Sequence, residues 1–284
     1  MRFFYTSDLH GDTNFYRELI SICKKREVNF LILGGDLLPR KGHSNKSITE
    51  QKKFIHNFLG KTFRKIKQIH NIKIYAVFGN NDWAAVLEDF KDLEKDGLVN
   101  LLHNTYFKIN DNFFITGYPY VPPTRFSPKD FEKKDLNEHE VSNLTTFPVI
   151  SENGQIRRIK EKKLFQSRTS IEDDLKDFIN YAENNPENKV IYVMHSPPYG
   201  TMLDRLYNSQ PAGSKAIKNF IEKTQPFMTL HGHIHESPVV SYKYWEKIGS
   251  TISINPGQVG GFLSGVLFDI NDPEHTLHHI QYDK

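Results

Sequence analysis

The sequence lacks the features that mark secreted and membrane-spanning proteins. Its 284 residues include one cysteine, Cys23, so no disulfide can form within the chain and a reducing compartment is expected. No stretch approaches the ~18 consecutive apolar residues of a membrane span. The start, MRFFYTSDLH, lacks the ~7–15-residue apolar core of a signal peptide. We therefore expect a cytoplasmic protein with no membrane partner.

The chain also carries little net charge. It has 37 Lys and Arg against 34 Asp and Glu, which gives +3, and 38% of its residues are hydrophobic. This composition is that of a folded globular protein, and the length allows a substantial core. A balance so near zero does not by itself indicate a nucleic-acid partner, although it leaves one open. The oligomeric state does not follow from it.

The order of apolar patterns predicts an α/β fold. In the first half, continuous apolar runs at 2–7, 30–33 and 73–78 read as strands, and helical spacing separates them, beginning after Asp12 or Thr13. Strands that alternate with helices predict a parallel core sheet. The second half predicts further strands at 98–102, 105–110, 112–118, 189–194 and 226–230, helices at 170–184 and 214–223, and a tail of antiparallel strands at 251–255, 265–270 and 276–282. We expect one domain, 1–284, of two packed sheets with helices outside.

The stretch from 121 to 168 does not fit this alternation. It is rich in Pro, Lys, Asp, Glu and Asn and has little periodicity. A segment of this length without clear elements is either a functional lid or a solvated insertion. Both interpretations stay open from the sequence.

Polar residues gather where the predicted strands end. The five groups are Asp8-Leu9-His10, Gly34-Gly35-Asp36, Gly79-Asn80-Asn81-Asp82, His195-Ser196-Pro197-Pro198 and His231-Gly232-His233-Ile234-His235. In α/β sheets, the carboxyl ends of the strands are where sites form. Each group alone is commonly a turn or a structural histidine, but five groups that each follow a strand indicate a metal centre.

Local spacing supports that interpretation. In an extended chain, residues i and i+2 point the same way, so Asp8 and His10 are expected to converge, and so are His233 and His235. His231 and His233 share this spacing, so spacing alone leaves the choice between them open. Neighbouring glycines leave room for close approach of the backbone. Asp, Asn and His side chains suit Mn, Fe or Zn ions.

The motifs DLH, GGD, GNND, HSPP and GHIH, in this order, resemble the D-x-H, G-D, G-N-H-D/E, H and G-H-x-H motifs of the calcineurin-like metallophosphoesterases. The resemblance extends from residue 8 to residue 235 and implies an αββα sandwich of two mixed sheets with flanking helices. It also implies a site for two divalent metal ions, with one bridging carboxylate. The ligands that it implies are Asp8, His10 and His235 for the first ion, Asn80, His195 and His233 for the second, and Asp36 between them. His231 falls outside the motif and is expected to support or pack.

Such a pair of ions predicts a metal-dependent phosphatase or phosphodiesterase. Two divalent ions form a clamp for in-line displacement at phosphorus and make a bridging water acidic enough to be hydroxide near neutral pH. Two aspartates and one hydroxide against two divalent ions leave roughly one positive charge to attract a phosphate ester. The neutral Asn80 suits this balance better than an aspartate would. A non-catalytic metal-binding scaffold on the same fold is the alternative.

Asn81 departs from the family pattern, which places a general-acid histidine there. An asparagine transfers no proton, although its amide can donate a hydrogen bond to a phosphoryl oxygen. This predicts diester or activated monoester substrates, or an acid from elsewhere, for which His43 is a candidate. Asp82 is expected to orient the ligands. Pro39 stands where purple acid phosphatases carry a tyrosine ligand, so a ferric centre is not expected.

Substrate contacts are less well marked. Tyr199 and Arg205 follow His195 closely, and Arg125 stands at the head of the 121–168 segment. Arginine suits bidentate contact with phosphate. Surface arginines and a packing tyrosine are the alternative interpretation. The natural substrate and the metal used in the cell are left open.

Overall fold

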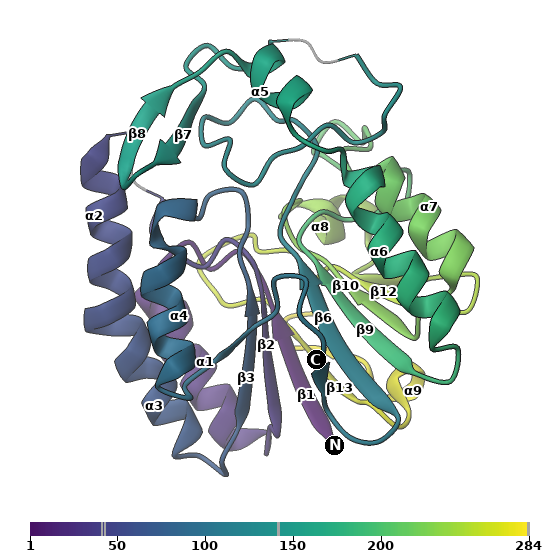
Figure 1. Ribbon diagram of the computed structural model, residues 1–284. Coiled ribbons are helices and arrows are strands. Elements are labelled where there is room, and N and C mark those ends of the chain that lie inside the picture. Colours follow the sequence, from purple (N-terminus) through teal and green to yellow (C-terminus); the bar gives the residue numbers. More distant parts are fainter. Residues whose placement is uncertain (41, 43, 141–142, 283–284) are drawn as a thin grey trace.

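The computed structural model describes residues 1–40, 42, 44–140 and 143–282, and two six-stranded sheets form its centre (Figure 1). The first sheet has the order β14-β13-β1-β2-β3-β4. Its strands are β1 (Arg2–Thr6), β2 (Phe30–Gly34), β3 (Lys73–Val77), β4 (Asn100–Leu101), β13 (Val266–Asp269) and β14 (His278–His279). The strands β1 to β4 are parallel, and β13 runs antiparallel to β1.

The second sheet has the order β11-β12-β10-β9-β6-β5. Its strands are β5 (Phe107–Lys108), β6 (Phe113–Tyr118), β9 (Lys189–Met194), β10 (Met228–Leu230), β11 (Trp245–Ile248) and β12 (Thr251–Ile254). The four inner strands are parallel, while β5 and β11 run antiparallel at the two edges. The predicted sandwich of two mixed sheets is confirmed.

Helices cover the outer face of each sheet, as Figure 1 shows. The first sheet is covered by α1 (Thr13–Lys25), α2 (Asn45–Phe54), the π-helical turn η1 (Ile55–Leu59), α3 (Gly60–Lys67), the 3₁₀ turn η2 (Ala84–Val86) and α4 (Leu87–Lys95). The second is covered by α6 (Ile171–Asn184) and α7 (Lys215–Thr224), and the short helices α8 (Ser237–Ser241) and α9 (Pro273–Thr276) follow. Within the described ranges, no helix combines the length and the apolar composition that a membrane crossing requires.

The alternation of side chains along β1 explains how the layers pack. Phe3 and Tyr5 join the core between the two sheets, whereas Phe4 joins the core beneath the helices of the first sheet. Successive residues of a strand point to opposite faces, so one short apolar run supplies both layers. The strand β2 is buried along its whole length for the same reason.

Two helix starts follow from capping side chains. The Asp12 carboxylate accepts a hydrogen bond from the Asn14 N–H at 2.8 Å, which makes Asp12 rather than Thr13 the cap of α1. The Ser170 hydroxyl accepts from the Asp173 N–H at 3.0 Å and begins α6 at the predicted place. Such caps satisfy backbone donors that have no partner within the helix.

Other expectations were wrong or incomplete. The tail was predicted to be antiparallel, but β12 runs parallel to β10 and is antiparallel only to β11. The helix α4 and the strand β11 were not predicted at all. Only two residues of α4, Phe90 and Leu93, are buried, which leaves a weak periodic signal. Tertiary pairing decides such segments more than local pattern does.

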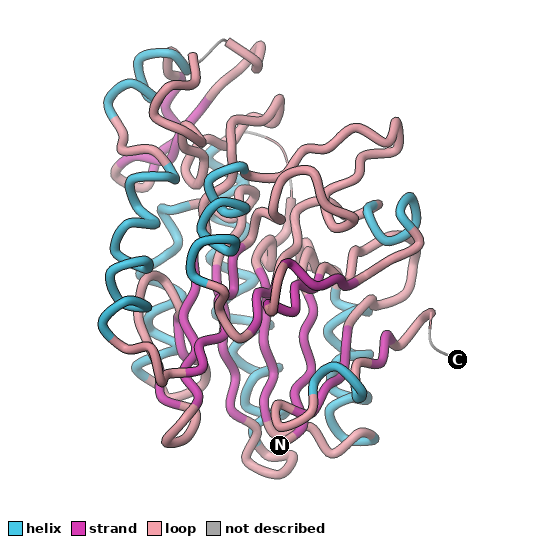
Figure 2. The backbone as a smooth tube through the Cα atoms, turned by 90° about the vertical axis from the view of Figure 1, so that its right-hand side faces the viewer, coloured by secondary structure: helices cyan, strands magenta, loops and turns pink. Residues whose placement is uncertain are grey.

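The segment 121–168, here called the insertion, lies above the carboxyl ends of the strands in Figure 1. Figure 2 shows loops gathered at the same end. The insertion contains a hairpin of β7 (Val149–Glu152) and β8 (Gln155–Arg158) and the helix α5 (Glu161–Ser167).

A buried ionic cluster holds the insertion together. Lys129 Nζ lies 2.9 Å from Glu132 Oε2 and 3.1 Å from Glu161 Oε1, and all three side chains are fully buried. Burial outweighs the attraction of Lys129 and raises the pKa of Glu132 to about 7. Charged side chains are therefore buried here in positions that apolar residues would usually fill, which explains why the sequence shows little apolar periodicity in this segment. Whether the insertion acts as a lid stays a prediction.

Removing the cation of this cluster should destabilise the protein. We expect Lys129→Met to lower the free energy of unfolding by about 3–5 kcal/mol at neutral pH, since it leaves two buried carboxylates unpaired. The loss should shrink as the pH falls from 7 to below 4.5, because protonation then removes the unpaired charge. Urea unfolding measures both effects.

Lys176→Met is the matched control. Lys176 pairs with Asp173 at 2.7 Å, but its side chain is 63% exposed. Its replacement should leave the free energy of unfolding nearly unchanged, because solvent screens an exposed ion pair. Equal effects of the two variants would contradict a stabilising role of the buried cluster.

Candidate metal centre

The predicted ligands lie where neighbouring strands of both sheets end. Asp8, Asp36 and Asn80 follow β1, β2 and β3 of the first sheet. His195 follows β9 of the second sheet, and the segment 231–235 follows β10. The carboxyl ends of the two sheets therefore meet at one place, beneath the insertion (Figure 1).

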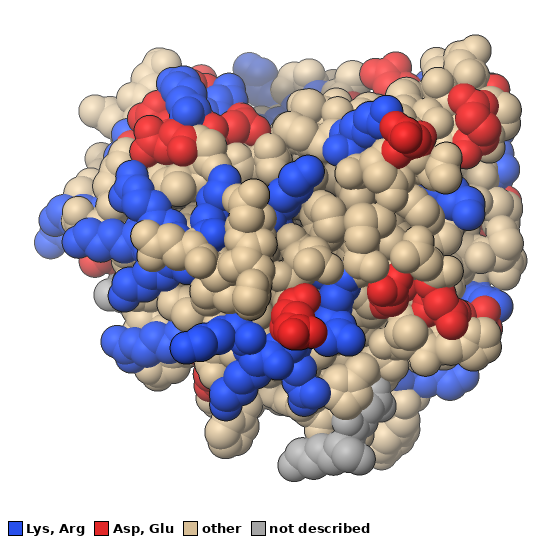
Figure 3. Space-filling view, turned by 90° about the horizontal axis from the view of Figure 1, so that it is seen from below, with Lys and Arg blue, Asp and Glu red and all other residues tan. Residues whose placement is uncertain are grey.

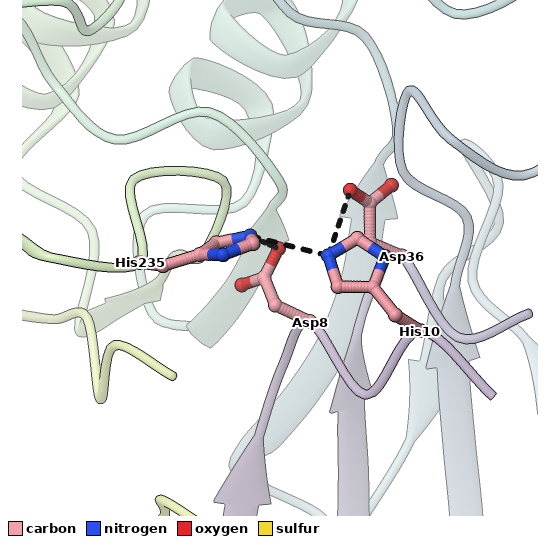
Figure 4. A group of neighbouring side chains, drawn as sticks. All are labelled: Asp8, His10, Asp36 and His235. Atoms are coloured by element: carbon pink, nitrogen blue, oxygen red, sulfur yellow. Dashed lines mark hydrogen bonds and ion pairs between the residues drawn. The ribbon is translucent and has the colours of Figure 1, made fainter. Parts of the chain in front are cut away.

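One group of donors is drawn in Figure 4. It consists of Asp8, His10, Asp36 and His235, whose ligand atoms all lie within 4.8 Å of one another. His235 Nε2 is 3.1 Å from Asp8 Oδ1 and 3.3 Å from His10 Nε2. His10 Nε2 in turn lies 3.8 Å from Asp36 Oδ2. Two carboxylates and two imidazoles that converge in this way could hold one divalent ion.

A second group surrounds the other oxygen of Asp36. His195 Nε2 lies 3.5 Å from Asp36 Oδ1, and the His195 and His233 rings are 5.4 Å apart between centroids. Asn80 is fully buried. Among the described residues, neither polar atom of its amide has a hydrogen-bond partner, and His195 Nε2 has none either. Buried polar atoms rarely lack partners, so this donor set fits a second ion.

Left-handed backbone, rather than extended chain, brings the donors together. Asp8, His10, Asp36 and His233 have φ angles of 61°, 45°, 53° and 65°. The expectation that i and i+2 converge because the chain is extended was therefore wrong, although Asp8 and His10 do converge. Backbone bonds hold these strained turns: the Asp8 N–H donates to the Gly35 carbonyl and the His10 N–H to the Asp36 carbonyl. Strain of this kind is found at functional sites.

Two glycines allow the close approach. A methyl group on Gly79 would overlap both the Asp36 carboxylate and the His195 ring. A methyl group on Gly232 would overlap the Ser7 hydroxyl and the Asp8 carboxylate. The absence of a side chain at these positions is thus a requirement of the packing.

The charges of the centre favour a cation. Burial disfavours a charged ring at His195, but the carboxylates of Asp36 and Asp8 outweigh it and raise the pKa of His195 to about 9. Burial lowers the pKa of His233 to about 3. Burial would raise the pKa of Asp36, yet His195 and His10 together hold it below its usual range. Burial would lower the pKa of His235, but the carboxylate of Asp8 outweighs it and raises that pKa. The two buried carboxylates therefore attract positive charge, which protonated rings supply in the protein alone and a divalent ion could supply in their place.

Asp82 ties two of the ligand-bearing loops together. Its fully buried carboxylate accepts hydrogen bonds from the N–H groups of Gly79 at 2.9 Å, Leu38 at 2.9 Å and Leu37 at 3.1 Å. Burial and the charge of Asp36 raise its pKa to about 7. Asp82 thus joins the loop after β2 to the loop after β3, and its role in orienting ligands stays a prediction.

Asn81 is bonded to the Asp36 carboxylate. Its backbone N–H donates to Asp36 Oδ1 at 2.8 Å and its side-chain amide donates to Asp36 Oδ2, while its Oδ1 has no partner among the described residues. His231 is fully buried and bonds to the carbonyls of Met194 and Ser196. It therefore supports the backbone on both sides of His195.

The residues that were predicted to contact substrate lie in different surroundings. The Arg205 guanidinium donates to the carbonyls of Thr201 and Ser209 in its own loop and makes no bond to a predicted ligand. Arg125 is exposed. Tyr199 is 36% exposed, with Lys215 above its ring. His43 lies outside the described residues.

The sequence analysis did not single out Arg40 as a residue near the candidate metal centre. This exposed residue, four positions after Asp36, lies close enough to His10 for its charge to add to burial, the larger cause, in lowering the pKa of that ring. Its position shortly after the GGD motif was the sequence feature that could have indicated this proximity. Pro39, the residue before it, packs against Gly11.

The unpartnered amide of Asn80 gives a test that needs no substrate. In metal-free protein, Asn80→Leu removes two buried polar atoms without breaking a hydrogen bond, so the variant should be as stable as the wild type or up to about 1–3 kcal/mol more stable. Urea unfolding in chelator measures this. Added Mn²⁺ should raise the thermal midpoint of the wild type more than that of the variant.

Asn255→Leu provides the control. Asn255 is also fully buried, but its amide donates to Leu203 and Ile234 carbonyls and its oxygen accepts from the Gly257 N–H. This variant should lose about 1–3 kcal/mol because partners are left unsatisfied. Equal losses in both variants would count against a metal role for Asn80.

Comparison with known proteins agrees with this geometry. The sequence model described as calcineurin-like phosphoesterase matches residues 1–237. No curated protein matches the chain. Among solved structures, TT1561 of Thermus thermophilus is similar with a TM-score of 0.60 at 14% identity, covering 98% of this chain and 97% of that one.

Two further structures are similar. A dimetal phosphatase from Danio rerio has a TM-score of 0.55 at 11% identity, over 94% of this chain and 92% of that one. A putative 5′-nucleotidase from Staphylococcus aureus has a TM-score of 0.51 at 15% identity, over 98% of this chain and 52% of that one. At these identities they show the fold alone, whereas the family match covers most of the sequence. The chain belongs to the calcineurin-like phosphoesterase family.

Proposed function

We propose that this protein is a phosphoric ester hydrolase that uses two divalent ions, Mn, Fe or Zn. In this proposal Asp36 is shared between the ions. The first ion is held by Asp8, His10 and His235, and the second by Asn80, His195 and His233. The observation that carries the proposal is the buried Asn80 amide, which has no hydrogen-bond partner among the described residues. Beside it in support, His195 Nε2 lies 3.5 Å from Asp36 Oδ1, whereas His10 Nε2 lies 3.8 Å from the other oxygen, Asp36 Oδ2.

The ions would supply an activated water and polarisation of the phosphoryl group. The side chains set the charge of the site. Asp8 and Asp36 contribute two negative charges, and Asn80 and the imidazoles, as neutral ligands, contribute none. A loaded centre therefore keeps positive charge with which to attract a phosphate ester, and the lowered pKa of both carboxylates supports their staying ionised.

Asn81 decides which esters suit the site. Its amide holds Asp36 and, as an asparagine, it gives no proton to a leaving oxygen. The Asp82 carboxylate is turned to backbone N–H groups and is not free to act in its place. The proposed substrates are therefore activated esters, whose acidic leaving groups depend least on a general acid, or phosphodiesters whose leaving oxygen takes its proton from another acid or from water.

A non-catalytic scaffold on the same fold is the second candidate. Such a protein needs no complete ligand set, whereas suitable residues stand at all seven ligand positions of this chain. The hydrolase is therefore preferred. A cytoplasmic location, suggested by the single buried cysteine, remains part of the proposal.

Metal analysis and two chromogenic esters test the function. We expect two ions per chain after incubation with Mn²⁺, and Mn²⁺-dependent hydrolysis of bis(p-nitrophenyl) phosphate at least as fast as that of p-nitrophenyl phosphate. Loss of a residue that only supports a metal ligand lowers activity or metal affinity by ~10–100-fold. Because Asp36 is itself a proposed ligand, Asp36→Asn should lower activity or metal affinity by more than this. Asp130→Asn, a buried aspartate in the insertion, should retain activity. Two bound ions with no hydrolysis would favour the scaffold.

Restoring the family's histidine tests the role of Asn81. Asn81→His should raise kcat on unactivated monoesters, such as an alkyl phosphate, by at least about tenfold, within the ~10²–10⁴ range of general acid catalysis. It should leave p-nitrophenyl esters nearly unchanged, since their leaving group needs little protonation. Asn81→Ala with a metal count controls for the lost bond to Asp36. No gain in a fully metal-loaded histidine variant would refute the account.

A further inference from the structure

The outer side of the insertion concentrates positive charge that the net charge of the chain conceals. Residues 157–163 read RRIKEKK, with five basic residues and one acidic residue. The acidic residue, Glu161, is turned inward, where it accepts from the N–H groups of Leu144 and Thr145 and pairs with Lys129. Its charge therefore does not reach the surface.

A groove of about 950 Å³ lies along this side, here called the basic groove. Its lining consists of four basic residues, Arg158, Lys160, Lys162 and Lys163, with Asn143, Thr145, Thr146, Pro148, Ile159, Gln166 and the inward-turned Glu161. In the described part of the chain, no acidic side chain pairs with any of its three lysines, so their charge is available to an anion.

Two aromatic rings connect this groove to the metal centre. Phe126 and Phe147 are 45% and 44% exposed, which is unusual for large apolar side chains. Each lies under an arginine: the Arg158 guanidinium is 4.8 Å from the Phe147 ring centroid, and that of Arg40 is 4.7 Å from the Phe126 centroid.

The two rings lie on neighbouring stretches of chain. The Ser127 hydroxyl donates to the Phe147 carbonyl, and the Val149 N–H donates to the Ser127 carbonyl at 3.1 Å. Arg40 belongs to the loop that carries Asp36. The surface that leads from Arg40 over Phe126 and Phe147 to the basic groove is called the basic–aromatic track below.

This combination fits a flexible chain of phosphates and flat rings better than other anions. Proteins bind single-stranded nucleic acids with a positive groove along the backbone and aromatic side chains on which bases stack. An acidic peptide would match the charge but would not use ring and guanidinium pairs. A small monoester would need neither the groove nor the rings. A lipid surface would require a flat basic face rather than a groove.

We propose that the basic–aromatic track binds single-stranded RNA or DNA and leads one of its phosphodiesters to the metal centre. This rests on the proposed function. In the reaction, the oxygen of a water forms a bond to phosphorus and the bond from phosphorus to one nucleoside oxygen breaks. One proton of the water ends on that leaving oxygen, and the other stays with the phosphomonoester or enters solvent.

Another basic surface competes with this assignment. Figure 3 shows Lys and Arg side chains gathered on the face seen from below, at the opposite end of the molecule from the insertion. The last turns of α1 and α3 carry lysines there, among them Lys24, Lys25 and Lys65. Because that end holds the amino ends of the strands, an anion bound there would not reach Asp36.

Binding is measured with chelated, metal-free protein, so that hydrolysis does not interfere. The probes are fluorescent oligo(dT) and oligo(U) of about 20 nucleotides, longer than the ~4–16-nucleotide sites of known single-strand binders. We expect Lys160→Gln/Lys162→Gln/Lys163→Gln to weaken binding at least about tenfold at low salt. The slope of log affinity against log salt should fall by about 2, at about 0.7 per lost contact.

The matched control is Lys24→Gln/Lys25→Gln/Lys65→Gln, which removes the same charge from the opposite end and should change affinity less than about twofold. Phe126→Ala/Phe147→Ala should weaken binding about fivefold or more with an unchanged salt slope, since stacking releases no counterions. Equal effects of the two lysine variants would overturn the assignment. Loss of affinity for anionic vesicles with no effect of the ring variant would overturn it in favour of a lipid surface.

Bis(p-nitrophenyl) phosphate separates this inference from the proposed function. This ester is too small to use the track, so the Lys160 triple variant should cleave it at the wild-type rate while its KM for oligonucleotides rises. A wild-type enzyme that cleaves the small diester but binds no oligonucleotide would overturn the inference and leave the hydrolase in place. Oligonucleotide binding without cleavage of any ester would overturn the hydrolase and the substrate assignment together.

Discussion

Buried carboxylate charge that attracts compensating positive charge determines the character of this molecule. Asp8 and Asp36 are each 1% exposed, at the tips of two adjacent strands. Removing a carboxylate from water costs several kcal/mol unless a partner compensates. Burial disfavours charge on every nearby ring, but Asp36 and Asp8 raise the pKa of His195 and Asp8 raises that of His235, whereas the pKa values of His10 and His233 are lowered. In the protein alone, protonated rings therefore compensate the carboxylates, and divalent ions are the groups that would take the place of those protons.

The sandwich keeps the two halves of this centre in register. The first sheet supplies the two aspartates, His10 and Asn80, and the second supplies the other three histidines, so a small shift between sheets would separate them. Tyr5 in β1 donates to the His231 carbonyl after β10 at 2.7 Å, and the His233 N–H donates to the Asp8 carboxylate. These bonds, with the apolar core between the sheets beneath them, fix the distance between the halves. A buried network of this kind rigidifies only when its members are satisfied, and among the described residues the Asn80 amide is one of the buried groups that these bonds leave without a partner.

How far the sequence predicts all this depends on the range of the interactions. The strand β2 and the Ser170 cap are local: four apolar residues or one hydroxyl decide them, and both were predicted. The order of the polar motifs also sufficed to place the donors at strand ends. The left-handed turns at Asp8 and His10 were not predictable from spacing, because they depend on bonds to a loop more than twenty residues away. The buried cluster around Lys129 was missed because, although Glu132 is close in sequence, its other partner Glu161 is 32 residues distant.

Net charge was the least informative property of the sequence, because it sums charges whose positions in the fold depend on interactions between distant residues. A value of +3 averages over a centre with two buried carboxylates, a buried cluster of one lysine and two glutamates, and a segment, 157–163, that is strongly positive. Screening confines each of these to about 10 Å in salt, so a phosphate ester near the insertion meets local charge and not the sum. The buried Glu161 shows the difference between summed charge and surface charge within a single helix. The carboxylate that would have cancelled one lysine is instead used to fold the insertion, and the same side chain thus stabilises the segment and leaves its outer side basic.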